Sequence, residues 1–447
     1  MQENEFISEL INKVNKTNLS VFLGAGVSMD TGLPSWKALF KNVAREIGLD
    51  IDKTNDYYQL AQYCENRLGG DFRTTIGDSL KEFKTESKYT KTVVELPANS
   101  YWTTNFDEVL DNAIKAKYKT APNIISKDEE LIKARTKSTK TIYKMNGHFT
   151  EQGNWVLTKR DLENYSKNHE AMLTFFKREL VVNTFLFLGY SFTDTLVLSA
   201  LRDVRRYFGD KDILYHYTIL IDDESSEFSH FVKNLEKSYG IKVLTAKNGD
   251  NVIEVIGKLN SEIKNRRIYI SGAFREELPN RSKAANIVKQ LIPKLLEKGF
   301  NISTGMGRNL GEMVLGTTKN WLQENHENVD HRLEYHLYED CDNDEVKKAK
   351  RAEFMENSGI VIFMFGQGDY GEEGSGGTKK EFEIAKERGL KIIPIGATGY
   401  QSKQIFEEVK SDISNYHYLQ GVINDLNDNI DDVEKIKDAV MKAIDSA

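Results

Sequence analysis

Short apolar runs recur along the chain and alternate with segments of helical periodicity. In the first part of the chain the apolar runs lie at residues 19–23, 101–104, 141–145, 181–188, 217–221 and 241–244. Intervening segments such as 4–16 and 56–68 place apolar side chains three or four residues apart, as one buried face of a helix does. Strands that alternate with helices in this way predict a doubly wound α/β domain with a parallel sheet.

The same pattern starts again near residue 266. Apolar strands are predicted at residues 266–271, 300–304, 359–365 and 391–395, and each of them ends in a turn of Ser, Thr or Gly. We therefore predict an α/β chain with two Rossmann-like domains, one over residues 1–262 and a smaller one over residues 266–447.

Composition narrows the functional classes. The net charge of −7 argues against a dedicated nucleic-acid binder, and no apolar run approaches the roughly 20 residues that span a bilayer. The first residues lack the features of a signal peptide. Cys64 and Cys341 are the only cysteines, so neither a zinc site nor a disulfide framework is expected. We expect a cytoplasmic protein without membrane, nucleic-acid or metal partners.

The first apolar run leads into Gly24-Ala25-Gly26-Val27-Ser28, which has the character of a phosphate-binding loop. Glycines let the backbone approach a pyrophosphate, and the N–H groups of the following turn face the anion. Met29 stands where the third glycine of the dinucleotide fingerprint would be, so this motif alone is a weak signal.

Polar residues also follow the second predicted strand, in Thr103-Thr104-Asn105-Phe106-Asp107. The carboxyl ends of strands in an α/β sheet are where ligands usually bind. Asp107 is equally well explained as the N-cap of the next helix, whereas Asn105 precedes that cap and is not.

Five motifs in this order and spacing resemble the sirtuin (Sir2) family over roughly residues 1–260: Gly-Ala-Gly-Val-Ser, Gly-Leu-Pro, Thr-Thr-Asn-Phe-Asp, the Lys-Met-x-Gly strand end and Gly-Tyr-Ser. The resemblance implies a Sir2-like doubly wound parallel sheet that binds NAD. The NAD-binding residues that it implies are Gly24, Ala25, Gly26, Ser28, Thr31, Asp107, Gly189 and Ser191. The catalytic candidates are Asn105, Asn146 and His148.

Two departures from that family bear on the reaction. Deacylating sirtuins carry a zinc module held by four cysteines, which this chain lacks, so protein deacylation is disfavoured. Hydrolysis of the N-glycosidic bond of NAD by water needs no peptide groove, so this reaction stays open. In addition, Asn146 occupies the position of the family's His base, and the loss of a positioned base typically costs about 10²–10⁴-fold in rate.

Three interpretations of Asn146 stay open. The site is inactive as written, through a His-to-Asn change. Alternatively, His148 takes over as the base, because a continuing strand would place residues 146 and 148 on one face, although an ordinary loop histidine explains His148 equally well. Or Asn105 and Asp107 suffice, because cleavage passes through an oxocarbenium-like state that needs charge stabilisation more than proton removal.

The order of the two domains resembles the NAD-degrading effectors of the bacterial Thoeris antiphage systems, and the second domain resembles the SLOG family. The resemblance implies a homotetramer that hydrolyses NAD when its SLOG domain binds a cyclic ADP-ribose isomer made by a TIR-domain partner. The signal-binding residues that it implies are Ser271, Gly272, Ala273, Gly305, Gly307, Arg351, Gly377, Thr378 and Glu381.

These residue types suit an anionic nucleotide, which needs backbone N–H groups, a forked cation and a carboxylate for ribose hydroxyls. The alternatives are a solvated helix face for Arg351 and a helix-terminal acid for Glu381. Two other functions also stay open. One is a non-catalytic sensor of NAD or another nucleotide. The other is a LOG-like nucleotide phosphoribohydrolase, since residues 374–381 resemble the LOG signature without its usual Pro.

Overall fold

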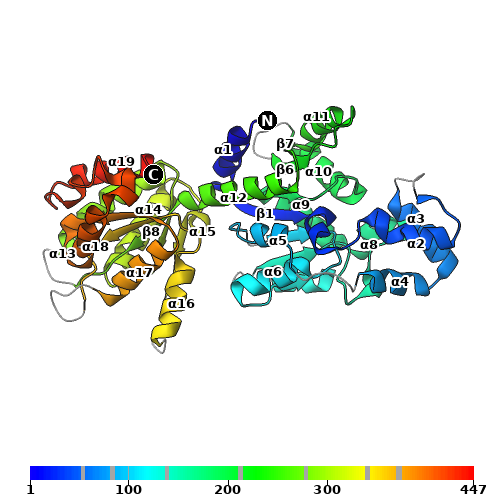
Figure 1. Cartoon of the computed structure of the whole chain (residues 1–447), viewed down its shortest axis with the longest axis horizontal. Helices are drawn as coiled ribbons and strands as arrows, with labels where there is room; N and C mark the ends of the chain where they lie inside the picture. The colour runs from blue at the N-terminus through cyan, green and yellow to red at the C-terminus, as the bar shows by residue number, and fades with distance from the viewer. Residues whose placement is uncertain are drawn as a thin grey trace. The chain divides into compact units, whose positions relative to one another are not determined.

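The computed structural model describes residues 1–51, 56–80, 86–98, 100–135, 140–209, 215–275, 280–337, 343–368 and 375–447. Cys341 and Gly374 lie outside the described residues. The chain divides into two compact units, Met1–Asn260 and Ser261–Ala447 (Figure 1). None of the helices in the described ranges is both long and apolar enough to cross a membrane.

The first unit is built on seven parallel strands in the order β3-β4-β2-β1-β5-β6-β7. Their bounds are β1 Asn18–Leu23, β2 Ser100–Thr103, β3 Asn123–Ile125, β4 Thr141–Lys144, β5 Asn183–Leu188, β6 His216–Ile221 and β7 Ile241–Ala246. The predicted doubly wound α/β sheet is therefore confirmed. Because β1 lies between β2 and β5, the chain leaves it toward one edge of the sheet and later returns to its other side.

Helices connect these strands. They are α1 Glu3–Val14, α2 Trp36–Glu46, α3 Tyr57–Leu68, α4 Asp71–Ser79, α5 Lys88–Val93, α6 Val109–Tyr118, α7 Lys159–Glu163, α8 Tyr165–Asn168, α9 Glu170–Val182, α10 Thr195–Phe208, α11 Phe228–Tyr239 and α12 Gly249–Asn265, with 3₁₀ helices η1 Ala25–Thr31, η3 Asp128–Arg135 and η4 Gln152–Asn154. Helices α2, α3 and α4 gather at one end of this unit (Figure 1). Their apolar faces share one buried cluster with Phe106 and Trp155.

One predicted boundary is wrong. The apolar run 181–188 was expected to be a single strand, but its two valines end α9 and β5 begins at Asn183. Val182 is 42% exposed, whereas the strand is buried from Thr184 onward. The two valines are β-branched and favour a strand locally. Helix α9 nevertheless buries Leu180 and extends over the two valines that follow it.

The second unit has a five-stranded parallel sheet in the order β10-β9-β8-β11-β12. Its strands are β8 Arg267–Ser271, β9 Asn301–Thr304, β10 Leu333–Tyr335, β11 Ile360–Met364 and β12 Lys391–Ile395. Its helices are α13 Asn280–Glu297, α14 Leu310–Glu324, α15 Val329–Arg332, α16 Asp344–Phe354, α17 Gly376–Glu387, α18 Tyr400–Ser411 and α19 Val433–Asp445, with 3₁₀ helices η6 Gly396–Thr398, η7 Ile413–Leu419 and η8 Asp425–Asn427.

All four predicted strands of this unit are present, and β10 is an addition. Both strands that the periodicity missed, β3 and β10, are three residues long and lie at the edge of their sheets. Three residues are too few for an apolar pattern to separate a strand from a loop.

Both sheets contain a point where the strand order reverses, between β1 and β5 in the first unit and between β8 and β11 in the second. Loops on the two sides of such a point diverge at the carboxyl ends of the strands. The crevice between them is where open α/β sheets bind ligands.

The histidine that opens β6 yields a prediction about stability. His216 is buried, its Nδ1 accepts the N–H of Phe185 at 3.2 Å, and burial lowers its pKa from 6.5 to about 3. The unfolded chain therefore binds a proton at a higher pH than the folded chain does. The contribution of neutral His216 to the free energy of unfolding is complete above pH 6.5. It is lost as the pH falls, by about 2 kcal/mol at pH 5.

We expect denaturant unfolding of the wild type to show this loss between pH 7.5 and pH 5. The variant H216N, whose amide oxygen can accept the same N–H, should show a correspondingly smaller loss. Equal losses in the two proteins would contradict the assignment.

Candidate functional site

The glycine loop after β1 lies directly against the loop after β5. Gly24 N donates to Leu188 O and Gly26 N donates to Gly189 O, both at 3.0 Å. A Cβ on Gly24 would stand 2.4 Å from Gly189 O, and one on Gly189 would stand 2.6 Å from Val27 N. Gly189 also has a φ of +60°, which favours glycine. Three predicted NAD-binding glycines therefore form one backbone junction at the reversal point of the sheet.

The chain after Gly24 forms the 3₁₀ helix η1, which carries three more predicted residues, Ala25, Ser28 and Thr31. Thr31 Oγ1 donates to Ser28 O at 2.6 Å, and both side chains are buried. Ser28 Oγ faces Asp107 Oδ1 at 3.4 Å. This contact joins the end of β1 to the end of β2.

Asn105 and Asp107 occupy the strand end that the sequence singled out. Asn105 Nδ2 donates to Gly24 O at 3.1 Å, so it is fixed against the glycine loop. The explanation of Asp107 as the N-cap of α6 is wrong, because Glu108 holds that position. From one residue earlier, Asp107 Oδ1 accepts Val109 N at 3.0 Å and also faces Ser28. Burial raises the pKa of the Asp107 carboxyl. The carboxyl thus serves the start of α6 and the site together.

A cavity of about 40 Å³ lies between the segments that follow β1 and β2, and the predicted glycines Gly24, Gly26 and Gly189 do not line it. Its polar lining comes from Ser28, Thr104, Asn105 and Asp107, and its apolar lining comes from Ala25, Leu33, Pro34, Trp36, Leu39, Leu80 and Phe106. Pockets for small ligands usually measure about 300–1,000 Å³. The polar residues are therefore brought together, but the space that they enclose is narrow.

The expectation that residues 146 and 148 share one strand face is wrong. Strand β4 ends at Lys144, and Gly147 has a φ of +104°, which breaks the alternation of side chains. Asn146 and His148 consequently make separate contacts, and neither lines the cavity.

His148 faces the start of α6. Its Nε2 lies 3.5 Å from Asp111 Oδ1 and 3.6 Å from Glu108 Oε1, and its Nδ1 shares a hydrogen bond of 2.9 Å with Thr150 Oγ1. Such a histidine can orient carboxylates. The rest of its side chain is buried.

Asn146 is fully buried and is linked through Tyr58 to the buried carboxyl of Asp194. Its Nδ2 donates to Tyr58 Oη at 3.3 Å, and Tyr58 Oη donates to Asp194 Oδ2 at 3.2 Å. Burial raises the pKa of both Tyr58 and Asp194. Sequence reasoning missed this pair, although Asp194 stands in the same strand-end segment as Gly189. Ser191, also from that segment, shares a 2.8 Å hydrogen bond with Thr193 and is exposed.

Lys144 is a second omission of the sequence analysis. It is completely buried, pairs with Asp111 Oδ2 at 3.0 Å and donates to the carbonyl oxygen of Asp107. A buried lysine needs such partners because an isolated charge is costly to desolvate. The sequence feature that could have revealed Lys144 is the position of a lysine at the end of a largely apolar strand.

In the second unit a cavity of about 360 Å³ opens at the carboxyl ends of β8, β9 and β11. All nine predicted signal-binding residues line it: Ser271, Gly272, Ala273, Gly305, Gly307, Arg351, Gly377, Thr378 and Glu381. This volume falls in the range of small-molecule sites. Arg275, Arg308 and Gln367, which the sequence analysis did not include, also line it.

The polar centre of this cavity is Glu381. Its carboxylate accepts Ser271 Oγ at 2.5 Å and Tyr269 Oη at 3.3 Å, and Arg351 Nε lies 4.0 Å away. The Arg351 side chain is 12% exposed, so the alternative of a solvated helix face is wrong. Glu381 likewise points into the cavity instead of acting only on its own helix.

The floor of this cavity consists of closely packed backbone. Gly272 has a φ of +148°, and a Cβ there would stand 1.8 Å from Met364 O. A Cβ on Gly307 would stand 2.0 Å from Gly272 O. Within the described ranges, neither unit contains a group of three or more His, Cys, Asp or Glu side chains that could hold a metal ion.

Comparison with known proteins supports the two-part organisation. The model of the Sir2- and TIR-associating SLOG family matches residues 251–447, and that of the SIR2-like domain matches residues 99–244. The expected Sir2-like and SLOG-type character of the two sheets is confirmed.

Curated relatives match along nearly the whole chain. NAD(+) hydrolase ThsA of Bacillus cereus is 28% identical, over 98% of this chain and 97% of that protein. NAD(+) hydrolase ThsA of Acinetobacter baumannii is 27% identical, over 96% of each chain. Defense-associated sirtuin 2 of Bacillus subtilis is 26% identical over 54% of this chain and 24% of its own length. The predicted resemblance to this class of effector is therefore confirmed.

The buried ion pair beneath Asp107 yields a prediction. Replacement of Lys144 by Met leaves Asp111 buried beside fewer counter-charges, so we expect K144M to lose about 3–5 kcal/mol of unfolding free energy. The double variant K144M/D111N removes the uncompensated charge and should recover part of the loss. Denaturant titration measures both, and a double variant no more stable than K144M would contradict the role of the pair.

Proposed function

We propose that this chain hydrolyses NAD at the nicotinamide N-glycosidic bond and acts in bacterial antiphage defence. The observation that carries the proposal is the convergence of Ser28, Asn105 and Asp107 on one cavity between the segments that follow β1 and β2. The similarity to proteins named NAD(+) hydrolase ThsA over nearly the full chain supports the same reaction.

The reaction consumes one water molecule. The bond between ribose C1′ and the nicotinamide nitrogen breaks, nicotinamide leaves as a neutral molecule, and the water oxygen bonds to C1′ and releases a proton. Asp107 is suited to stabilise the positive charge that develops on the ribose, and its raised pKa suits it to accept the proton. Asn105 would orient the substrate from the glycine loop.

This assignment favours one of the three interpretations of Asn146. Asn146 and His148 do not line the cavity, whereas Asn105 and Asp107 do. We infer that the carboxyl and amide of the β2 end carry the reaction without a histidine base. The cavity has to widen to admit a dinucleotide, and its apolar wall of Leu33, Trp36 and Leu39 belongs to the segment before and within α2.

We also propose that the second unit binds the activating signal, a cyclic ADP-ribose isomer produced by a TIR-domain protein, and that the active form is a cytoplasmic homotetramer. The cavity size and the match to a Sir2- and TIR-associating SLOG family support the binding of a small-molecule signal by the second unit. Arg351 would hold a phosphate, Glu381 would accept ribose hydroxyls, and the backbone at Gly272 and Gly307 would cradle the anion.

A second candidate function is NAD binding without turnover. Asn146 favours it, since an amide stands where Sir2-like enzymes have a base and its Nδ2 is engaged with Tyr58. Calorimetry and an NAD-consumption assay on the same preparation separate the two functions. Binding without product, in both the wild type and N146H and with or without cyclic ADP-ribose isomers, would establish the sensor and overturn hydrolysis.

For the catalytic assignment, we expect D107N to lower NAD consumption about 10²-fold, because the charge opposite the developing cation is removed. The exposed D223N is the matched control and should retain wild-type activity. Chromatographic measurement of nicotinamide release checks both. A D107N protein as active as D223N would show that Asp107 has no catalytic role.

For the signal site, we expect R351Q to weaken binding of the activating cyclic ADP-ribose isomer by about 10–100-fold, because charge-assisted hydrogen bonds to phosphate are lost. K348Q, on the exposed side of the same helix, should bind as the wild type does. Titration calorimetry gives both affinities, and equal affinities would remove Arg351 from the site.

A further inference from the structure

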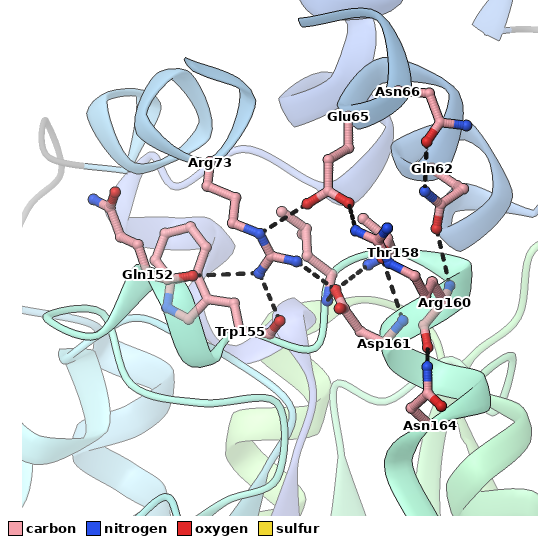
Figure 2. A network of polar contacts seen from close by, with 11 residues as sticks. Gln62, Glu65, Asn66, Arg73, Gln152, Trp155, Thr158, Arg160, Asp161 and Asn164 are labelled. Carbon is pink, nitrogen blue, oxygen red and sulfur yellow. Dashed lines mark hydrogen bonds and ion pairs between the residues drawn. The ribbon is translucent and has the colours of Figure 1, made fainter. Parts of the chain in front are cut away.

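A single arginine links three segments around the proposed NAD site. Arg73, on α4, donates from Nε to Glu65 Oε1 at 2.9 Å and from Nη2 to Asp161 Oδ2 at 2.6 Å. Its Nη1 donates to the main-chain oxygens of Trp155 at 2.7 Å and Gln152 at 3.3 Å. Figure 2 shows the guanidinium at the centre of these acceptors. Its side chain is only 18% exposed, so the network is largely shielded from solvent.

Trp155 connects this network to the segment after β2, which lines the site, and to the segment after β4, which lies next to it. Its ring packs on Phe106, with the ring centroids 4.6 Å apart, and Phe106 lies between Asn105 and Asp107 in the chain. Its Nε1 donates to His148 O at 2.8 Å. The residue is buried and contacts both loops.

The neighbouring backbone is tied in the same way. Val156 N donates to Asn146 O at 2.8 Å. Val156 directly follows Trp155, whose main-chain oxygen accepts a hydrogen bond from Arg73. Helix α4 also lies directly on this loop, since a Cβ on Gly77 would stand 2.2 Å from Gln152 Nε2. Fixing α4 therefore fixes the loop that follows β4.

We propose that Arg73 is a positioning residue of the NAD site, which holds Trp155 and through it the two strand-end segments 104–108 and 145–149. The inference rests on the proposed function. A guanidinium suits this task because its planar fork donates to several acceptors at once, whereas the point charge of a lysine does not. Burial would raise the pKa of Asp161, but the N–H of Thr158 and the charge of Arg73 hold it low, so the pair stays ionised.

The same network supplies a matched control. Arg160 pairs with Glu65 Oε2 at 2.6 Å and is 64% exposed. Among the described contacts, it makes none with Trp155 or Gln152. Loss of Arg160 thus removes an ion pair with the same carboxylate and leaves the loop attachment in place.

Hydrogen–deuterium exchange on the full chain tests the positioning directly. We expect R73Q to speed exchange about tenfold in both segments, with R160Q unchanged. W155F keeps a ring against Phe106 and loses the donor to His148, so it should speed exchange in 145–149 alone. R73K, which keeps the charge without the fork, replaces R73Q should the latter fail to fold.

NAD turnover is the second measurement. We expect kcat to fall about 10²-fold in R73Q with little change in KM, because misplaced groups act in the transition state, and R160Q to match the wild type. Equal exchange in R73Q and R160Q overturns the inference, as does equal turnover. A wild-type chain that binds but never consumes NAD instead overturns the proposed function, and the exchange result then decides the role of Arg73 by itself.

Discussion

The contact between the backbones of Gly24 and Gly189 is the constraint on which the first unit depends. Parallel strands with crossovers on both sides of β1 force the loops after β1 and β5 to meet at one point. Side chains there would overlap main-chain atoms of the opposite loop. The loop that this contact holds also carries Ser28 and accepts Asn105 Nδ2 at Gly24 O, so a carboxyl with a raised pKa, that of Asp107, lies beside it.

The cavities of the two units differ in size and in lining. The cavity of the second unit is wide and polar at its centre, and Glu381 is already oriented by Ser271 and Tyr269. The cavity of the first unit has its polar groups assembled but is closed by apolar side chains such as Trp36. The second unit therefore has an open cavity with its polar groups in place, whereas the cavity of the first unit is too narrow for a dinucleotide.

Much of this organisation could be predicted from the sequence, and the exceptions have physical causes. The ends of strands carry recognisable glycines and polar residues, so Gly24 and Asn105 were predicted from local pattern, whereas Glu381 was implied only by the family resemblance. Lys144 was missed because its partner on α6 depends on how that helix packs under the strand. The separation of Asn146 from His148 depends on one backbone torsion at Gly147, which no apolar periodicity encodes.

The backbone floor of the second cavity limits which of its positions can change. Substitution at Gly272 or Gly307 would push main chain against main chain, so this surface is closed to change whatever ligand is bound. The rim is made of side chains, among them Arg275, Arg308 and Gln367, which can be exchanged one at a time. A change in what this cavity accepts therefore has to come from its side chains and not from its backbone floor.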